Sequence, residues 1–235
     1  MSLAHFVTYR GPAAVASELA SWFRDGPAAG LAQTPGVDYL DIYSPSGVDH
    51  TDPYVDDRDA PILIAQTGHQ DIAALQAMLS SSALGAAADL GSASVGDLRL
   101  THDAMTQEFF AVGDDDQPRP MTAPLSFVVR YHGPCEDPAV FTEHYRAGHA
   151  TALERLPGIR NVLVYARIDW HDPTAIERAN YLLGNEVVFD SIEGLNAALN
   201  SPMRHELRKH YDTFPGWTGH NTHHAMDRQR LAPTD

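Results

Sequence analysis

The chain has 235 residues, of which 43% are hydrophobic and 20% charged, and its formal net charge at pH 7 is -15. This length and apolar content suffice for a soluble globular protein with one large domain or two small ones. The acidic balance argues against nucleic acid and anionic membranes as partners, because binding phosphates needs clustered Lys and Arg.

The first half is predicted to contain strands at residues 3–9, 37–43, 61–67 and 98–112 and helices at residues 12–24 and 72–80, from the spacing of its apolar residues. Asp71 is a suitable N-cap for the second helix. An acidic loop rich in turn-forming residues is expected at 44–60, and a mixture of helix and loop at 80–96.

Residues 113–123 are polar, contain Pro and lack periodicity, which is typical of a linker. The second half then runs through the same order, with strands predicted at residues 125–132, 159–167, 185–190 and 220–229, one helix at 137–156, and a second helix capped by Ser191 that runs through Leu207.

The two halves match in register. A shift of 122 residues places Pro157-Gly158 on Pro35-Gly36 and Tyr165 on Tyr43. We interpret the chain as a tandem repeat, with a degenerate unit at 1–112 and a second unit at 124–235. Each unit has the order β-α-β-β-α-β of a ferredoxin-like fold, so we expect an α+β protein. Because both helices of such a unit cover one face of its sheet, the other face needs a second sheet.

The segment FTEHYRAGHATALERLPG at 141–158 carries a family resemblance. Residues 125–229 resemble an EthD domain of the dimeric α/β-barrel superfamily, whereas the first half resembles it weakly. The resemblance implies two ferredoxin-like units packed sheet to sheet as a barrel, here within one chain. It also implies a small-molecule enzyme or an accessory protein of a catabolic oxygenase pathway.

His149 is the first candidate for catalysis. It lies on the predicted helix 137–156, eight residues before Pro157, and histidine is the usual general acid or base near neutral pH. Barrels similar to this one place a pocket histidine at the same point, so the resemblance implies an acid or base role for His149. The matching residue of the first half is Pro27, which indicates that only the second half keeps this group.

Strand alternation suggests which side chains hold a substrate. Arg130 and His132 share one face of their strand, and Tyr165 points toward the same expected cavity inside the barrel. One of His223 and His224 should face this cavity too, but periodicity does not decide which.

The histidines at 220, 223 and 224 invite comparison with a metal site. Alternation separates His223 from its neighbours, and no HExxH or cysteine-based spacing occurs, so no metal is expected. The chain also lacks GxGxxG, GxxxxGK[ST] and GxSxG motifs, which leaves nicotinamide binding, P-loop phosphoryl transfer and serine hydrolysis without support.

Three functional hypotheses follow. The first is a cofactor-independent isomerase, dehydratase, lyase or oxygenase acting by proton transfer on an aromatic or polyketide-like compound. The second is a non-catalytic binding protein, and the third a haem protein, since some barrels of the superfamily bind haem through histidine. The less acidic second half is where an anionic or phenolic ligand would be tolerated.

We also expect a cytoplasmic protein, because the sequence shows neither a signal peptide nor an apolar run of about 18 residues. The single cysteine, Cys135, excludes an internal disulfide and agrees with a reducing compartment. A monomer with an internal pseudo-dimer, or a homodimer of it, is the expected assembly.

Overall fold

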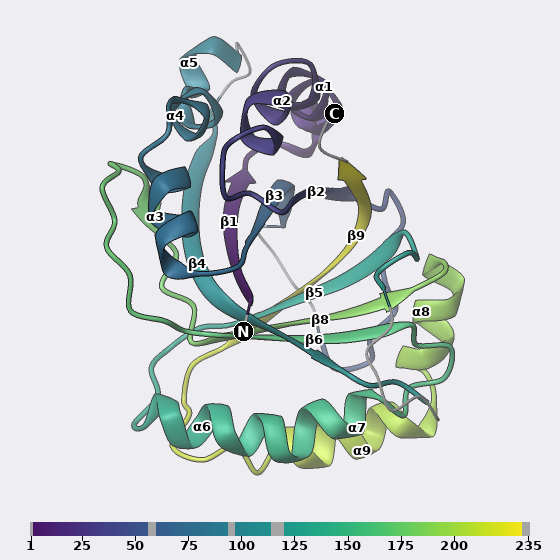
Figure 1. The fold of residues 1–235 in the computed structure, drawn as a ribbon. Helices are drawn as coiled ribbons and strands as arrows, with labels where there is room; N and C mark the ends of the chain where they lie inside the picture. The colour runs from purple at the N-terminus through teal and green to yellow at the C-terminus, as the bar shows by residue number, and fades with distance from the viewer. Residues whose placement is uncertain (1, 56–59, 94–96, 114–119, 232–235) are drawn as a thin grey trace.

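The computed structural model describes residues 2–55, 60–93, 97–113 and 120–231 (Figure 1). The elements of the first half are β1 (Ser2–Arg10), η1 (Ala13–Val15), α1 (Ala16–Asp25), α2 (Pro27–Ala32), β2 (Tyr39–Pro45), β3 (Pro61–His69), α3 (Ile72–Leu79), α4 (Ser82–Ala88), α5 (Leu90–Ala93) and β4 (Arg99–Phe110). Those of the second half are β5 (Leu125–Tyr131), α6 (Pro138–His144), η2 (Tyr145–Ala150), α7 (Thr151–Leu153), β6 (Asn161–Ala166), β7 (Glu177–Arg178), β8 (Leu183–Phe189), α8 (Ile192–Leu199), α9 (Pro202–Tyr211) and β9 (Asn221–Leu231).

Eight of the strands form a closed antiparallel barrel. Their order is β1-β3-β2-β9-β5-β8-β6-β4, and β4 pairs back onto β1. The two-residue strand β7 pairs in parallel with β4. The predicted α+β class and the barrel architecture are therefore confirmed.

The two halves join edge to edge at two seams. At one seam β2 pairs with β9, where Leu40 lies opposite Leu231. At the other β4 pairs with β6, where Phe109 lies opposite Leu163. Because β4 and β9 each pair with strands of both halves, neither half presents an open sheet edge at these positions.

Helices cover the outside of the barrel. The helices of the first half gather on one side and α6, α7, α8 and α9 on the opposite side (Figure 1). Each helical layer packs on the outer face of its own sheet through a separate apolar core. A third core fills the inside of the barrel with side chains that include Phe6, Tyr43, Tyr165, Val188 and Met226.

The helix caps follow the sequence signals. Asp71 accepts a hydrogen bond from the backbone N–H of Ala74, and Ser191 accepts one from Gly194. Both side chains satisfy a donor that the first turn of a helix leaves unpaired. The two predicted caps are confirmed.

One predicted helix is wrong in its extent. The helix expected from Ser191 through Leu207 is divided into α8 and α9, with Ser201 in an extended conformation between them. Pro202 explains the break, because its ring excludes the helical conformation of the preceding residue and it has no N–H for the ladder. Proline at this position instead starts α9.

The predicted linker 113–123 falls largely on residues 114–119, which lie outside the described residues. The boundaries 1–112 and 124–235, and the interpretation of the chain as a tandem repeat, stay predictions. Within the described ranges, no helix is both long and apolar enough to cross a membrane.

Candidate functional site

A cavity of about 230 Å³ lies in the second half, between the outer face of the sheet and the helices that cover it. Strands β5, β8 and β9 provide its floor, and η2, α7, α8 and α9 provide its walls. Residues 52–55 of the first half contribute to its remaining side. The polar lining residues are Asp52, Tyr54, Tyr131, His149, Asn185, Arg204, Arg208, Tyr211, Asn221 and His223, and the others are apolar.

The part of the floor formed by β5 and β8 is mainly apolar, and Asn185 interrupts it. Phe127, Val129 and Tyr131 point the same way because they alternate along β5, and Val187 of β8 joins them. Asn185, two residues before Val187, is 3% exposed. A buried amide among apolar side chains requires hydrogen-bonding partners.

Tyr145 supplies a partner for Asn185. The Asn185 amide nitrogen donates to the Tyr145 hydroxyl, which also hydrogen-bonds with the hydroxyl of Tyr131. Tyr131 in turn hydrogen-bonds with Asn221, whose amide lies 3.3 Å from Nε2 of His223. One polar network thus crosses the floor of the cavity from β8 to β9.

His149 enters the cavity from η2, a π-helical turn inserted between α6 and α7. Such turns shift the side chains that follow them and are frequent at functional sites. The imidazole is 6% exposed and lies 4.9 Å from the Tyr145 ring, between ring centroids. Its Nδ1 atom has no hydrogen-bond partner among the described residues. A buried nitrogen of this kind lacks the hydrogen bond that a polar atom removed from water needs.

Burial controls the protonation of His149. Removal from water lowers its pKa to about 3, and the positive charge of Arg204 acts in the same direction. The imidazole is therefore neutral near pH 7, so it accepts a hydrogen bond through one nitrogen and donates through the other.

An ion pair between the two halves lines one side of the cavity. Arg204 on α9 donates to Asp52 from both Nε and a terminal nitrogen, at 2.9 and 3.0 Å. The Asp52 side chain is fully buried and that of Arg204 is 12% exposed. Nearby, Thr51 hydrogen-bonds with Asn196 and Asn200 on the second half.

The structure separates His223 from His224. His223 lines the cavity, and its ring lies 5.6 Å from that of Phe127. His224 pairs with Val128 and lies on the same face of β9 as Met226, which belongs to the barrel interior. His223 is therefore the histidine of this pair that meets His149 in one cavity.

Arg130 and Tyr165 also lie inside the barrel, away from His149. The Arg130 guanidinium lies 4.4 Å from the Phe6 ring centroid and 5.3 Å from that of Tyr165. Tyr165 and His149 do not share a cavity, because they occupy opposite faces of the sheet.

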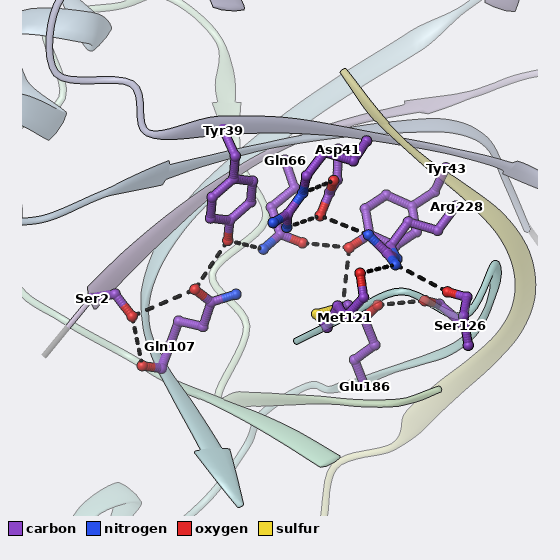
Figure 2. A network of polar contacts seen from close by, with 12 residues as sticks. Ser2, Tyr39, Asp41, Tyr43, Gln66, Gln107, Met121, Ser126, Glu186 and Arg228 are labelled. Carbon is purple, nitrogen blue, oxygen red and sulfur yellow. Dashed lines mark hydrogen bonds and ion pairs between the residues drawn. The ribbon is translucent and has the colours of Figure 1, made fainter. Parts of the chain in front are cut away.

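The hydroxyl of Tyr165 donates to Glu186 at 2.7 Å. Ser126 donates to the other carboxylate oxygen (Figure 2). The Tyr43 hydroxyl donates to Gln66 at 2.7 Å, and its oxygen lies 3.3 Å from the Glu186 carboxylate. Burial raises the pKa of Glu186, while the bonds from Ser126 and Tyr165 oppose that rise. These polar groups hydrogen-bond with one another, and their side chains occupy the interior of the barrel.

His132 lies near one end of the barrel, stacked on His220 with 4.3 Å between ring centroids. Burial lowers its pKa to about 4. It also meets the Tyr181 ring edge-on, at 5.2 Å. His132 does not line the cavity that contains His149.

Sequence reasoning missed Asp52, Arg204, Asn185 and Tyr145 as site residues. For Asn185 a signal existed, since it is the single amide in the strand Leu183–Phe189, next to Glu186 and among otherwise non-polar residues. For Asp52 and Arg204 no local pattern pointed to the contact, because they are 152 residues apart.

No group of three or more His, Cys, Asp or Glu side chains is positioned to hold a metal ion in the part of the chain that the structure describes. Haem does not fit the cavity as it stands. Its volume of about 230 Å³ lies below the roughly 300–1,000 Å³ typical of pockets for drug-sized ligands, and a tetrapyrrole is larger than most of these.

No family model matches the sequence, and no curated protein is significantly similar to it. Solved structures with the same fold include an anthrone oxidase-like protein, with a TM-score of 0.61 and 10% identity, covering 100% of this chain and 93% of that chain. A candidate monooxygenase from Lactobacillus acidophilus has a TM-score of 0.55 and 10% identity, covering 99% and 96%. An EthD family protein from Bacillus halodurans matches 42% of this chain and 96% of its own, at 24% identity and a TM-score of 0.34.

The first two similarities span nearly the whole of both chains. At these identities they establish the dimeric α/β-barrel fold and leave the chemistry to the site itself.

Proposed function

We propose that the second half binds a small aromatic or polyketide-like compound in the cavity beside His149 and acts on it by proton transfer without a cofactor. The observation that carries this proposal is a buried, neutral imidazole whose Nδ1 has no hydrogen-bond partner among the described residues, in the lining of a cavity that combines apolar and polar side chains. An apolar enclosure with a few convergent polar groups is typical of small-molecule sites.

The chemistry follows from the positions of the polar groups. His149 accepts a proton from an acidic C–H or O–H group of the ligand. The network through Tyr131 and Asn221 then holds the oxygen on which negative charge develops. An anion formed beside His149 raises the pKa of the imidazole, since an opposite charge favours the protonated form. The transferred proton is thereby retained in the site.

The reaction to test first is oxygenation, because two of the structures with this fold carry oxidase or oxygenase names. The experiment measures oxygen consumption with a panel of anthrones and polyhydroxylated aromatics, for the wild type and for His149→Asn. We expect the variant to fold and to lose at least about 100-fold in turnover. The control is His171→Asn at an exposed position. Turnover within a few-fold of wild type in His149→Asn would remove His149 from the mechanism.

A binding or accessory role is the second candidate, and the low pKa of His149 favours it. A pKa of about 3 makes the imidazole a weak base in the empty cavity, although still a good hydrogen-bond partner. This role predicts that a ligand binds saturably and is recovered unchanged. Mass spectrometry of the extracted ligand after incubation in air separates the two candidates.

We propose a monomer as the working assembly, because the barrel closes within one chain. A homodimer of this unit is the alternative, and light scattering in solution distinguishes them.

A further inference from the structure

A charged residue of the other half lines the cavity. Asp52 lies in the segment that follows β2, and its carboxylate receives two hydrogen bonds from Arg204. Arg204 also lies over the Tyr54 ring, 5.0 Å from its centroid. A bidentate Arg–carboxylate pair is stronger and more directional than a single charged contact, so this pair fixes both the segment and the guanidinium.

The buried cation of the cavity lining is already paired. The positive charge of Arg204 is balanced by Asp52, and that of Arg208 by Asp212 at 3.1 Å. The remaining polar lining groups are hydroxyls, amides and imidazoles. Arg208 is 37% exposed and its pair with Asp212 is open to solvent, so among the described lining residues no buried cation is left to receive an anionic ligand.

We propose that the cavity selects uncharged ligands and that Asp52 is the residue that determines this selection. The inference rests on the proposed function, since it concerns the ligand of the same cavity. A carboxylate entering the cavity has to displace Asp52 from Arg204 or remain without a counter-charge, and either event strands a buried negative charge. A neutral ketone or phenol meets no such penalty and uses the hydrogen bonds of Tyr131 and His149.

The test compares two ligands of nearly equal shape. 4-Hydroxyacetophenone is neutral and 4-hydroxybenzoate carries a carboxylate at about pH 7.5. Calorimetric titration of the wild type should give a dissociation constant at least about tenfold lower for the ketone. Asp52→Asn keeps the shape of the side chain and frees the charge of Arg204, so the preference should disappear or reverse in favour of the benzoate.

The double variant Asp52→Asn/Arg204→Gln is the matched control. It removes both charges, and the preference for the ketone should return. If Asp52→Asn does not fold, as judged by circular dichroism, Arg204→Gln replaces it. In Arg204→Gln the carboxylate of Asp52 has no counter-charge and repels the benzoate. The variant should therefore bind the benzoate more weakly than wild type does and bind the ketone as wild type does.

The outcomes separate the two proposals. A wild type that binds both compounds equally, or binds the benzoate more tightly, overturns the selection of uncharged ligands and leaves the cavity as a binding site. If Asp52→Asn still prefers the ketone as strongly as wild type does, Asp52 is not the cause of the preference. The same conclusion follows if Arg204→Gln binds the benzoate as tightly as wild type does. Failure of both compounds to bind the wild type at millimolar concentration contradicts the proposed function itself.

Discussion

The side-chain amide of Asn185 on β8 donates a hydrogen bond to the hydroxyl of Tyr145 in η2. This contact joins the floor of the cavity to the π-helical turn that also carries His149. Tyr145 is completely buried, and its hydroxyl is shared with Tyr131. One hydroxyl thus satisfies polar groups on two strands and holds the turn in place.

Removing that hydroxyl should destabilise the protein. Tyr145→Phe keeps the ring but leaves Asn185 and Tyr131 with one partner fewer in a buried place. We expect a loss of about 1–3 kcal/mol in the free energy of unfolding, measured with urea. Tyr211→Phe is the control, because Tyr211 is half-buried, and it should stay within about 0.5 kcal/mol of wild type. Equal losses in both variants would count against the network.

The depressed pKa of His149 predicts a loss of stability in acid. Below its ordinary value of 6.5 the unfolded chain takes up a proton, whereas the native imidazole stays neutral until about pH 3. Falling pH therefore favours unfolding by up to about 1.4 kcal/mol for each pH unit in this window. His149→Leu removes the effect, so its free energy of unfolding should fall less than that of wild type between pH 7 and 4. Parallel curves for the two proteins would contradict the neutral, buried state.

Glu186 predicts a dependence of the opposite sign. Burial inside the barrel raises its pKa above the ordinary 4.5. As pH rises above that value the unfolded chain releases the proton while the native state retains it, so rising pH favours unfolding. Glu186→Gln keeps an acceptor for the hydroxyls of Tyr165 and Ser126. The free energy of unfolding of the variant, minus that of wild type, should therefore be larger at pH 8 than at pH 5. Urea titrations at both pH values measure this difference. A constant difference would mean that Glu186 is already ionised at pH 5.

The buried ion pair between Asp52 and Arg204 should contribute more to stability than an ion pair on the surface. Asp52→Ala leaves Arg204, which is only 12% exposed, without its counter-charge. We expect a loss of about 3 kcal/mol in the free energy of unfolding. Asp190→Ala breaks the ion pair between Asp190 and Arg160, whose side chains are 62% and 49% exposed, respectively. This substitution should leave the free energy of unfolding nearly unchanged. Similar effects of the two substitutions would show that the Asp52 contact is also screened by solvent.

The fold could be predicted because its signals are local and repeated. Apolar periodicity indicates the strands, and Asp71 and Ser191 mark the starts of two helices. The match between the halves indicates two similar sheets, each with helices on one face only, so the free face of each sheet has to pack against the other. Apolar spacing continues across Pro202, so periodicity alone predicts one helix, whereas the missing N–H and the ring of Pro202 divide it into two.

The position of the site could be predicted only in part. Alternation correctly placed Tyr165 and Arg130 inside the barrel, but it does not tell whether that space is open or filled. Partners distant in sequence, such as Glu186, fill it. The cavity lies on the other face, where His149 meets residues whose contacts depend on the closed barrel rather than on any local pattern.

His223 and His224 provide a test of which face binds the ligand, because they are neighbours in sequence and point to opposite sides of β9. His223 lines the cavity next to Asn221, whereas His224 lies on the barrel side opposite Val128. His223→Gln should weaken the binding of 4-hydroxyacetophenone about tenfold, because it alters a polar group in contact with the ligand. His224→Gln should leave the affinity unchanged, which makes it the matched control. Calorimetric titration of both variants checks the expectation, and a larger effect from His224 would move the binding site into the barrel.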